Sequence, residues 1–509
     1  MNNKANNSIA KNTIVLYIRM VLTMIISLYT SRVILRILGV EDYGIYQSVG
    51  GIVGFLTFIN GALSTGTSRF LTYELGTGNF EKLKKVFSTT LIIHIIIAII
   101  VAILAETIGL WFLYNKLVIP SERFDAAVYA FHISILTSIF TLTQVPYNAS
   151  IISHEKMSIF AYMSLLEVSA KLGIVYLLSI GNIDKLKLYA TLLFIIQISL
   201  MLLYRIYCTR NFKETKFYLI FDKSIFKEIS SFSGWSLIAN ASTALNSQGV
   251  LILLNIFFEP AIVAARSISI QVNMAANQLV NNFRTAVNPQ IVKRLAANDI
   301  EGSQKLLLNS TEFSYYLMMI ICVPLFFLAD PILHLWLVNV PPYATPFLQL
   351  ILIQSLIQVF DTSFYTALYA KGRLKENALL SPTIGLIRFP IIYILFKLGY
   401  SPLSLSWACI VTYSVLSFII KPYLIIKIAG YNIKDIYSLL KKCAITTLWV
   451  TPVPAILYYY LNLNTLANCI VMLITCLLNV VIIIWFIGLN PDTRAILKGT
   501  IKQKLSTIF

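Results

Sequence analysis

The sequence predicts an all-α integral membrane protein with 14 transmembrane helices. We expect two six-helix bundles related by a parallel repeat, followed by two extra C-terminal helices. The first observation behind this prediction is composition: 58% of the 509 residues are hydrophobic and 12% are charged. Soluble proteins are about 45–50% apolar and about 25% charged. Too few polar side chains are present to cover the apolar surface, which excludes a soluble multidomain protein.

The second observation is a series of apolar runs. A helix needs about 20 apolar residues to cross the roughly 30 Å hydrocarbon core of a bilayer. Two of the runs, 43–66 and 261–288, are weaker because they are rich in Gly, Asn and Ser. The predicted spans are 12–38, 43–66, 86–113, 124–148, 157–180, 186–209, 230–258, 261–288, 309–335, 343–370, 377–397, 402–426, 438–461 and 465–488.

The third observation is the position of the basic residues, which give a net charge of +18. Of the 40 Lys and Arg residues, 28 fall on the side of the two termini, 7 on the opposite side and five inside spans. The positive-inside rule therefore places both termini in the cytoplasm of a multi-pass protein. Short basic blocks between apolar runs favour contact with membrane lipid headgroups over nucleic acid.

An internal repeat appears when the chain is shifted by 220 positions. The loop 75–85 then falls on 295–305, with identical residues at three positions. Six is an even number of spans, so both halves enter from the same side, as in transporters built from parallel repeats. The predicted division is an N-terminal bundle at 1–210, a cytoplasmic linker at 211–229, a C-terminal bundle at 230–430, and the extra helix pair and cytoplasmic tail at 431–509.

Several kinds of catalytic chemistry are missing from the sequence. No Walker A, GxSxG or HExxH motif occurs, and the four histidines are scattered. The six cysteines lie in or beside apolar segments without a CxxC pair, so we expect no disulfide framework, metal or cofactor. The predicted outside loops are short, which argues against a polymerase or ligase of lipid-linked glycans. We expect a protein that is not an enzyme.

Polar side chains recur along particular spans. In span 12–38 they share one face with Arg19, and in span 261–288 they include Arg266, Asn273, Asn277 and Arg284. Such stripes fit two structures: a hydrated central cavity with a basic lining, or helices packed through amide and hydroxyl side chains. For the amides both interpretations stay open, whereas for Arg266 we favour the cavity. Arg19 and Arg284 also lie close enough to the span ends to extend towards the surface.

Other ionisable residues lie deep in the spans, where each costs about 2.5–3.5 kcal/mol by insertion scales. Arg388 lies in the middle of span 377–397 and is a further cavity candidate. Glu167 precedes Lys171 by four residues, the favoured order for a helical ion pair. Asp361 and Glu106 have no partner on their own helices and are candidate proton or cation sites.

The motifs resemble the multidrug/oligosaccharidyl-lipid/polysaccharide exporter superfamily, most closely its polysaccharide, or O-antigen, flippase branch. The most specific motif is the GxxDYGxY-like turn at residues 39–46. The other motifs that carry the resemblance are Ser31-Arg32-Val33, His154-Glu155-Lys156-Met157, Ala161-Tyr162, Ala264-Ala265-Arg266, Asn288-Pro289-Gln290 and Lys371-Gly372-Arg373.

The resemblance implies a flippase in the bacterial inner membrane that moves undecaprenyl-diphosphate-linked oligosaccharide through a cationic cavity by alternating access. This cargo would serve surface-polysaccharide biosynthesis, such as the O-antigen of lipopolysaccharide, alongside polysaccharide-assembly proteins. Arginines in the first and eighth helices of related flippases contact the diphosphate, a role that falls on Arg19 and Arg266 here. The coupling ion, H⁺ or Na⁺, stays open. The alternative is a cation-coupled drug or small-molecule antiporter of the same fold.

Overall fold

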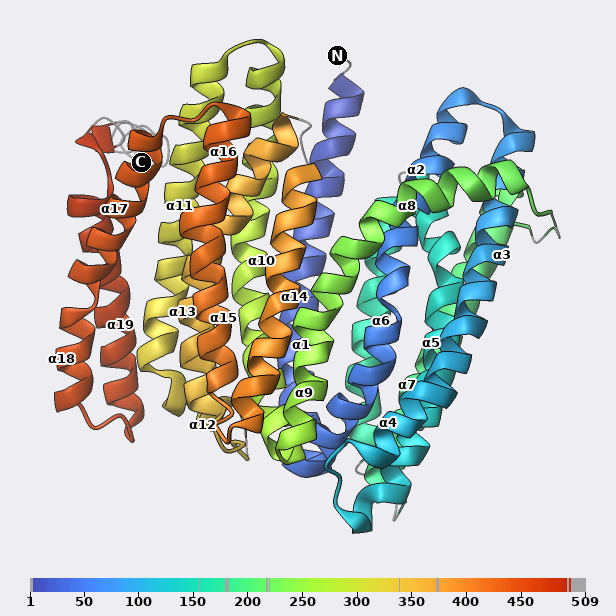
Figure 1. The fold of residues 1–509 in the computed structure, drawn as a ribbon, viewed down its shortest axis with the longest axis horizontal. Coiled ribbons are helices and arrows are strands. Elements are labelled where there is room, and N and C mark those ends of the chain that lie inside the picture. The colour runs from blue at the N-terminus through green and yellow to red at the C-terminus, as the bar shows by residue number, and fades with distance from the viewer. Residues whose placement is uncertain are drawn as a thin grey trace. The chain divides into compact units, whose positions relative to one another are not determined.

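A computed structural model gives the fold of the chain (Figure 1). Every regular element among the residues that it describes is a helix, as the sequence predicts. The described residues are 3–154, 156–178, 183–216, 218, 220–337, 339–371, 375–491 and 494–495.

The chain contacts define two compact units. The first unit comprises Met1–Ser267, Leu337–Pro342 and Gly385–Pro402. The second unit comprises Ile268–Trp336, Tyr343–Ile384 and Leu403–Phe509. The boundaries after Ser267 and before Gly385 fall inside helices, and the predicted division into bundles, linker and extra helix pair stays a prediction.

The helices of the N-terminal half, from α1 to α9, all belong to the first unit. Here α5 packs against α3 and α7, and α2 packs against α5 and α8. The elements are α1 (Asn3–Leu56), α2 (Phe58–Thr77), α3 (Phe80–Leu104), η1 (Ala105–Gly109), α4 (Leu110–Asn115), η2 (Ser121–Arg123), α5 (Phe124–Ser153), α6 (Met157–Leu177), α7 (Lys185–Asn211), η3 (Lys213–Thr215), α8 (Lys223–Ala244), η4 (Leu245–Gly249) and α9 (Val250–Phe257).

The C-terminal half begins with α10, whose first residues belong to the first unit. Within the second unit α13 packs against α11, α15 and α16, and α18 lies beside α19 (Figure 1). The elements are α10 (Pro260–Ala296), α11 (Ile300–Phe327), α12 (Ala329–Trp336), α13 (Ala344–Ala370), α14 (Lys375–Lys397), α15 (Ser404–Val415), η5 (Leu416–Ile420), α16 (Lys421–Ala429), α17 (Ile433–Val450), α18 (Pro452–Tyr460), α19 (Leu466–Ile483) and η6 (Ile484–Gly488).

Each predicted span coincides with one or more of these helices. In the described part of the chain, 10 helices are long and apolar enough to cross a membrane. The chain is therefore a multi-pass membrane protein, whereas the count of 14 spans and the side of the termini stay predictions.

The boundary between the first two predicted spans lies at Gly39, as the sequence predicts. Gly39 adopts φ 83° and ψ 169°, which is not helical, and it separates two helical segments within α1. A side chain at this φ would be strained, so glycine permits the sharp bend. The second predicted span, 43–66, is itself interrupted at Thr57, where α1 ends and α2 begins.

The internal repeat is visible in the helix bounds. The helices α3 and α11 begin at Phe80 and Ile300, and α5 and α13 begin at Phe124 and Ala344. Both pairs are separated by the 220 positions that the sequence predicts. The two halves therefore have corresponding helices in corresponding order.

The turns at corresponding positions also share their geometry. Gly78 and Asn298 both adopt the left-handed conformation, with φ 72° and 60°. The next residues, Asn79 and Asp299, cap α3 and α11: each side-chain oxygen accepts a hydrogen bond from a backbone N–H three residues later, at 3.1 and 2.9 Å. The loops 75–85 and 295–305 share few identical residues. Glycine and asparagine both tolerate the left-handed conformation, and asparagine and aspartate both cap helices, so the two loops form the same turn.

Arg123 joins three loops at one end of the first unit. Its Nε and Nη2 donate to the two carboxylate oxygens of Asp42, at 2.7 and 2.6 Å. Its Nη1 donates to Asp184 Oδ2 at 2.6 Å. Asp42 belongs to the GxxDYGxY-like turn. The aspartate of this motif therefore supplies the carboxylate that Arg123 binds through two hydrogen bonds.

Asp184 also caps α7, because its Oδ1 accepts a hydrogen bond from the N–H of Lys187 at 3.0 Å. Partial burial alone would raise the pKa of the Asp184 carboxyl. The hydrogen bonds from Arg123 and from the backbone outweigh burial, and its pKa lies below the ordinary value. This carboxylate thus stabilises the fold above its unfolded pKa, and that contribution is lost as the pH falls through its folded pKa.

We predict that Arg123→Gln destabilises the first unit by on the order of 2 kcal/mol at neutral pH, because two carboxylates lose their shared cation. The difference in melting temperature from the wild type should shrink below about pH 4, where aspartate protonates. Thermal unfolding of the purified protein between about pH 2.5 and pH 7.5 measures it. Lys116→Gln, an exposed cation, is the control; an equal shift in both variants contradicts the role of Arg123.

Candidate functional site

A buried ion pair lies inside the second unit. Asp361 Oδ1 on α13 is 3.2 Å from Lys421 Nζ on α16, and the Lys421 side chain is 3% exposed. Lys421 also donates a hydrogen bond to Asn377 Oδ1 on α14. Both charged residues belong to helices apolar enough to span a membrane. The partner that Asp361 lacks on its own helix therefore comes from another helix.

Arg284 of α10 lies near this pair. It is 8% exposed, so it does not extend to the surface. Its Nη2 donates to the carbonyl of Thr362 and, at 3.0 Å, to Thr366 Oγ1 on α13. Arg284 also interacts electrostatically with Asp361. Two cations thus share one carboxylate, and we name Arg284, Asp361, Asn377 and Lys421 the α13 charge cluster.

Sequence reasoning missed Lys421 and Asn377 as members of this cluster. Lys421 lies inside the predicted span 402–426, but it is not one of the five basic residues assigned to the interior of spans. Its position could have identified it, because five further residues of the span follow it, which is more than one helical turn. No sequence spacing links it to Asp361, because the two residues come from different helices.

One amide of α10 makes a contact between helices. Asn273 Nδ2 donates to Ser355 Oγ on α13 at 2.8 Å, whereas Asn277 Nδ2 donates to the carbonyl of Asn273 on its own helix at 2.9 Å. The Asn273 contact is of the helix-packing kind. A role for either residue in a cavity stays a prediction.

Two buried arginines belong to the first unit. Arg388 of α14 is 4% exposed and donates a hydrogen bond from Nη2 to Asn246 Oδ1. Asn246 lies in η4, a π-helical turn, and such turns often occur at functional sites. Arg266 of α10 is also 4% exposed and interacts with neighbouring groups. Both arginines are buried, and their predicted place in a cavity stays a prediction.

The side chain of Arg19 lies outside the described residues, although its backbone belongs to α1. Its predicted place in a shared cavity with Arg266 and Asn273 therefore stays a prediction.

The remaining acidic candidates also have partners. Lys171 Nζ is 2.6 Å from Glu167 Oε1, the ion pair that their spacing predicts. Glu106 Oε1 is 2.9 Å from His132 Nδ1 on α5, and about 44% of each side chain is exposed. Glu106 lies in η1, another π-helical turn. The sequence did not reveal His132 as its partner, because the two residues are on different helices.

Comparison with known proteins gives a match to one family and several likenesses in fold. A family model described as MatE matches residues 15–177. No curated protein matches the chain.

Three solved structures illustrate the likeness. A multidrug resistance MATE family transporter of the MOP superfamily, inward-facing, is 14% identical over 84% of this chain and 99% of its own, with TM-score 0.64. Lipid II flippase MurJ, inward closed, is 15% identical over 93% and 98%, with TM-score 0.69. A MOP superfamily transporter from Pyrococcus furiosus Vc1, described by the reverse polarity of its binding pocket, is 13% identical over 83% and 97%, with TM-score 0.59.

Identities this low carry information about the fold alone. Together with the helix order and the 220-residue repeat, they show that this chain has the fold of a MOP-superfamily transporter.

Proposed function

We propose that the protein flips lipid-linked oligosaccharide, namely undecaprenyl-diphosphate-linked repeat units of a surface polysaccharide, across the bacterial inner membrane by alternating access. The observation that carries this proposal is a group of buried cations in helices that coincide with predicted spans. Arg266, Arg284, Arg388 and Lys421 are each at most 8% exposed. Asp361 is the carboxylate that lies beside two of them.

Buried charge at this depth needs compensation. A charge in a low-dielectric interior costs several kcal/mol unless other groups compensate it, so a group of buried cations favours binding of an anion. A diphosphate supplies two or more negative charges, and arginine offers it a planar fork of donors while staying protonated. We assign the diphosphate contacts to Arg266 and Arg19, with Arg284 and Arg388 adding positive potential from α10 and α14.

Coupling to an ion is the second part of the proposal. The Lys421 ammonium already neutralises Asp361, so this carboxylate is poorly suited to an external Na⁺ while the pair is closed. The carboxylate–imidazole pair Glu106–His132 is a better candidate for H⁺, because both groups can hold a proton and their atoms lie within hydrogen-bond distance. Glu167 and Lys171 neutralise each other and act as a structural pair in this account.

The rival function is a cation-coupled drug antiporter, which the MatE match to residues 15–177 favours. A site for organic cations needs uncompensated carboxylates or aromatic faces in the transport path. The candidate carboxylates in the spans, Asp361, Glu106 and Glu167, each have a basic partner, and the charged side chains that are buried in the described part of the spans are cations. The lipid II flippase among the similar structures moves a lipid-linked cargo, in keeping with the flippase proposal.

We predict that glycan export falls in the order Arg266, Arg266→Lys, Arg266→Gln. Lysine keeps the charge but loses the donor fork, and glutamine loses the charge, so Gln should reduce export at least about tenfold. The measurement is surface polysaccharide in a deletion strain that carries each variant at equal membrane abundance.

The control for this series is Arg210→Gln, which removes an exposed arginine at the end of α7. It should leave export unchanged. Equal rescue by Lys and Gln at position 266 would refute the anion-binding role of Arg266.

A double-mutant cycle at Asp361 and Lys421 separates charge from structure. We predict that Lys421→Met alone destabilises the second unit by about 3–5 kcal/mol, because it leaves a buried carboxylate without its partner. The combined Asp361→Asn and Lys421→Met variant should recover most of this loss. Thermal unfolding of purified protein measures both effects.

The same double variant also tests function. Because it keeps the fold but removes both charges of the pair, we expect weaker glycan export than in the wild type at equal abundance. Export at the wild-type level would mean that the pair only stabilises the second unit and takes no part in transport.

A further inference from the structure

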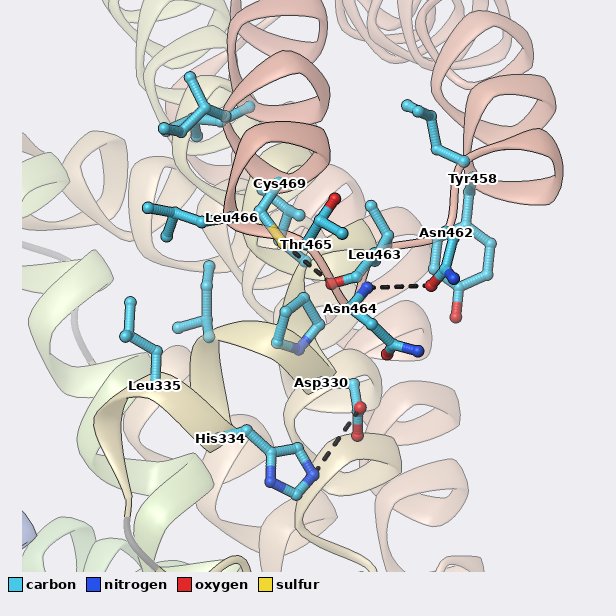
Figure 2. Close-up of a pocket in the computed structure, with 16 residues that line it drawn as sticks. Asp330, His334, Leu335, Tyr458, Asn462, Leu463, Asn464, Thr465, Leu466 and Cys469 are labelled. Atoms are coloured by element: carbon cyan, nitrogen blue, oxygen red, sulfur yellow. Dashed lines mark hydrogen bonds and ion pairs between the residues drawn. The ribbon is translucent and has the colours of Figure 1, made fainter.

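A cavity of about 760 Å³ lies at one end of the second unit, away from the α13 charge cluster. Its walls come from α12, the end of α18, the loop 461–465 and the start of α19. Figure 2 shows Asp330 and His334 on one wall and Asn462, Asn464 and Thr465 across from them. This volume is within the range of about 300–1,000 Å³ typical of small-ligand sites.

One wall carries a carboxylate and an imidazole. Asp330 Oδ2 is 3.8 Å from His334 Nε2, one helical turn away, and both side chains are more than half exposed. Thr345 Oγ1 donates a hydrogen bond to Asp330 Oδ1 at 2.9 Å and fixes the carboxylate. A ligand can therefore reach the carboxylate without breaking that hydrogen bond.

The opposite wall carries amides. The backbone N–H of Asn464 donates to Asn462 Oδ1 at 3.1 Å, which orders the loop. Within the described residues, the side-chain amide of Asn464 has no protein partner. One side of the cavity thus accepts hydrogen bonds at a negative charge, and the other side offers N–H donors.

The floor of the cavity is apolar. Leu466, Ile470 and Leu473 lie on one face of α19 at spacings of four and three, and their exposed fractions are 68%, 47% and 39%. Cys469 and Leu335 complete the apolar lining. This apolar stripe extends over about two helical turns and suits part of a hydrocarbon chain.

The cavity lies where membrane-spanning segments end. The candidate span of α11 ends at Phe327, one residue before the cavity-lining Leu328, and the candidate span of α19 begins at the cavity-lining Leu466. Its polar walls therefore belong to the headgroup region of the bilayer, and its apolar floor continues into the hydrocarbon.

We propose that this cavity binds a phospholipid with a primary amine headgroup, of the phosphatidylethanolamine class. The ammonium group donates to Asp330, the phosphate accepts from the Asn464 amide and His334, and one acyl chain lies along Leu466, Ile470 and Leu473. A primary ammonium has N–H donors for the carboxylate, whereas a choline headgroup has none. This lipid site is independent of the flipping function proposed above.

The first test is native mass spectrometry of the full chain in detergent, titrated with phosphatidylethanolamine, phosphatidylcholine and phosphatidylglycerol of identical acyl chains. We expect the amine lipid to bind most tightly. Asp330→Asn keeps an acceptor for Thr345 but removes the charge, and it should weaken the amine lipid about tenfold with little effect on the choline lipid. Asp299→Asn is the matched control, because asparagine caps a helix as well as aspartate.

The second test reports on the cavity itself. Of the six cysteines, all described, Cys469 is the partly exposed one and the other five are buried. Bound phosphatidylethanolamine should slow alkylation of Cys469 by N-ethylmaleimide, and Ile470→Trp, which fills the floor, should abolish this protection. Cys469→Ser gives the background.

Four results overturn the proposal. Equal affinity for the amine and choline lipids, or unchanged affinity in Asp330→Asn, removes the headgroup assignment. Preference for phosphatidylglycerol assigns the cavity to anionic lipids instead. Alkylation of Cys469 that no lipid slows shows that the bound lipids occupy other surfaces.

Discussion

The free-energy cost of charge in hydrocarbon constrains this chain more than any other interaction. Three helices that coincide with predicted spans, α10, α14 and α16, nevertheless bury Arg266, Arg284, Arg388 and Lys421. The described contacts lower this cost locally: Lys421 pairs with Asp361, and Arg284 and Arg388 donate hydrogen bonds to hydroxyl, carbonyl and amide oxygens. A group of four buried cations favours an anionic cargo, in keeping with the proposed function.

Much of the fold followed from the sequence because its signals are local. Apolar runs of about 20 residues and turn residues such as Gly78 mark where helices lie, and the 220-residue shift aligns the starts of α3 and α11. The break at Gly39 was predictable because glycine permits a positive φ, whereas the further interruption at Thr57 has no strong turn signal. The position of a helix is therefore predictable from the sequence, whereas an interruption without a turn residue depends on tertiary packing.

The candidate site was predictable only in part, and for the same reason. The pair Glu167–Lys171 lies on one helix, so its spacing predicts the contact. Asp361–Lys421 and Glu106–His132 join different helices, and a single sequence contains no spacing that reveals such pairs. The amides Asn273 and Asn277 form a polar stripe in the sequence, but the contact from Asn273 to Ser355 joins α10 to α13. A stripe identifies the face of a helix without saying what covers it.

The central claim is that positive charge at depth serves an anionic, lipid-linked cargo. The most direct measurement is translocation in liposomes that contain the purified protein, with an undecaprenyl-diphosphate-linked oligosaccharide in the outer leaflet and a glycosidase outside to report its disappearance. The account predicts protein-dependent protection of the diphosphate-linked lipid and no transport of a cationic dye in the same vesicles. Transport of the dye without translocation of the lipid-linked sugar would contradict the account and favour the drug antiporter.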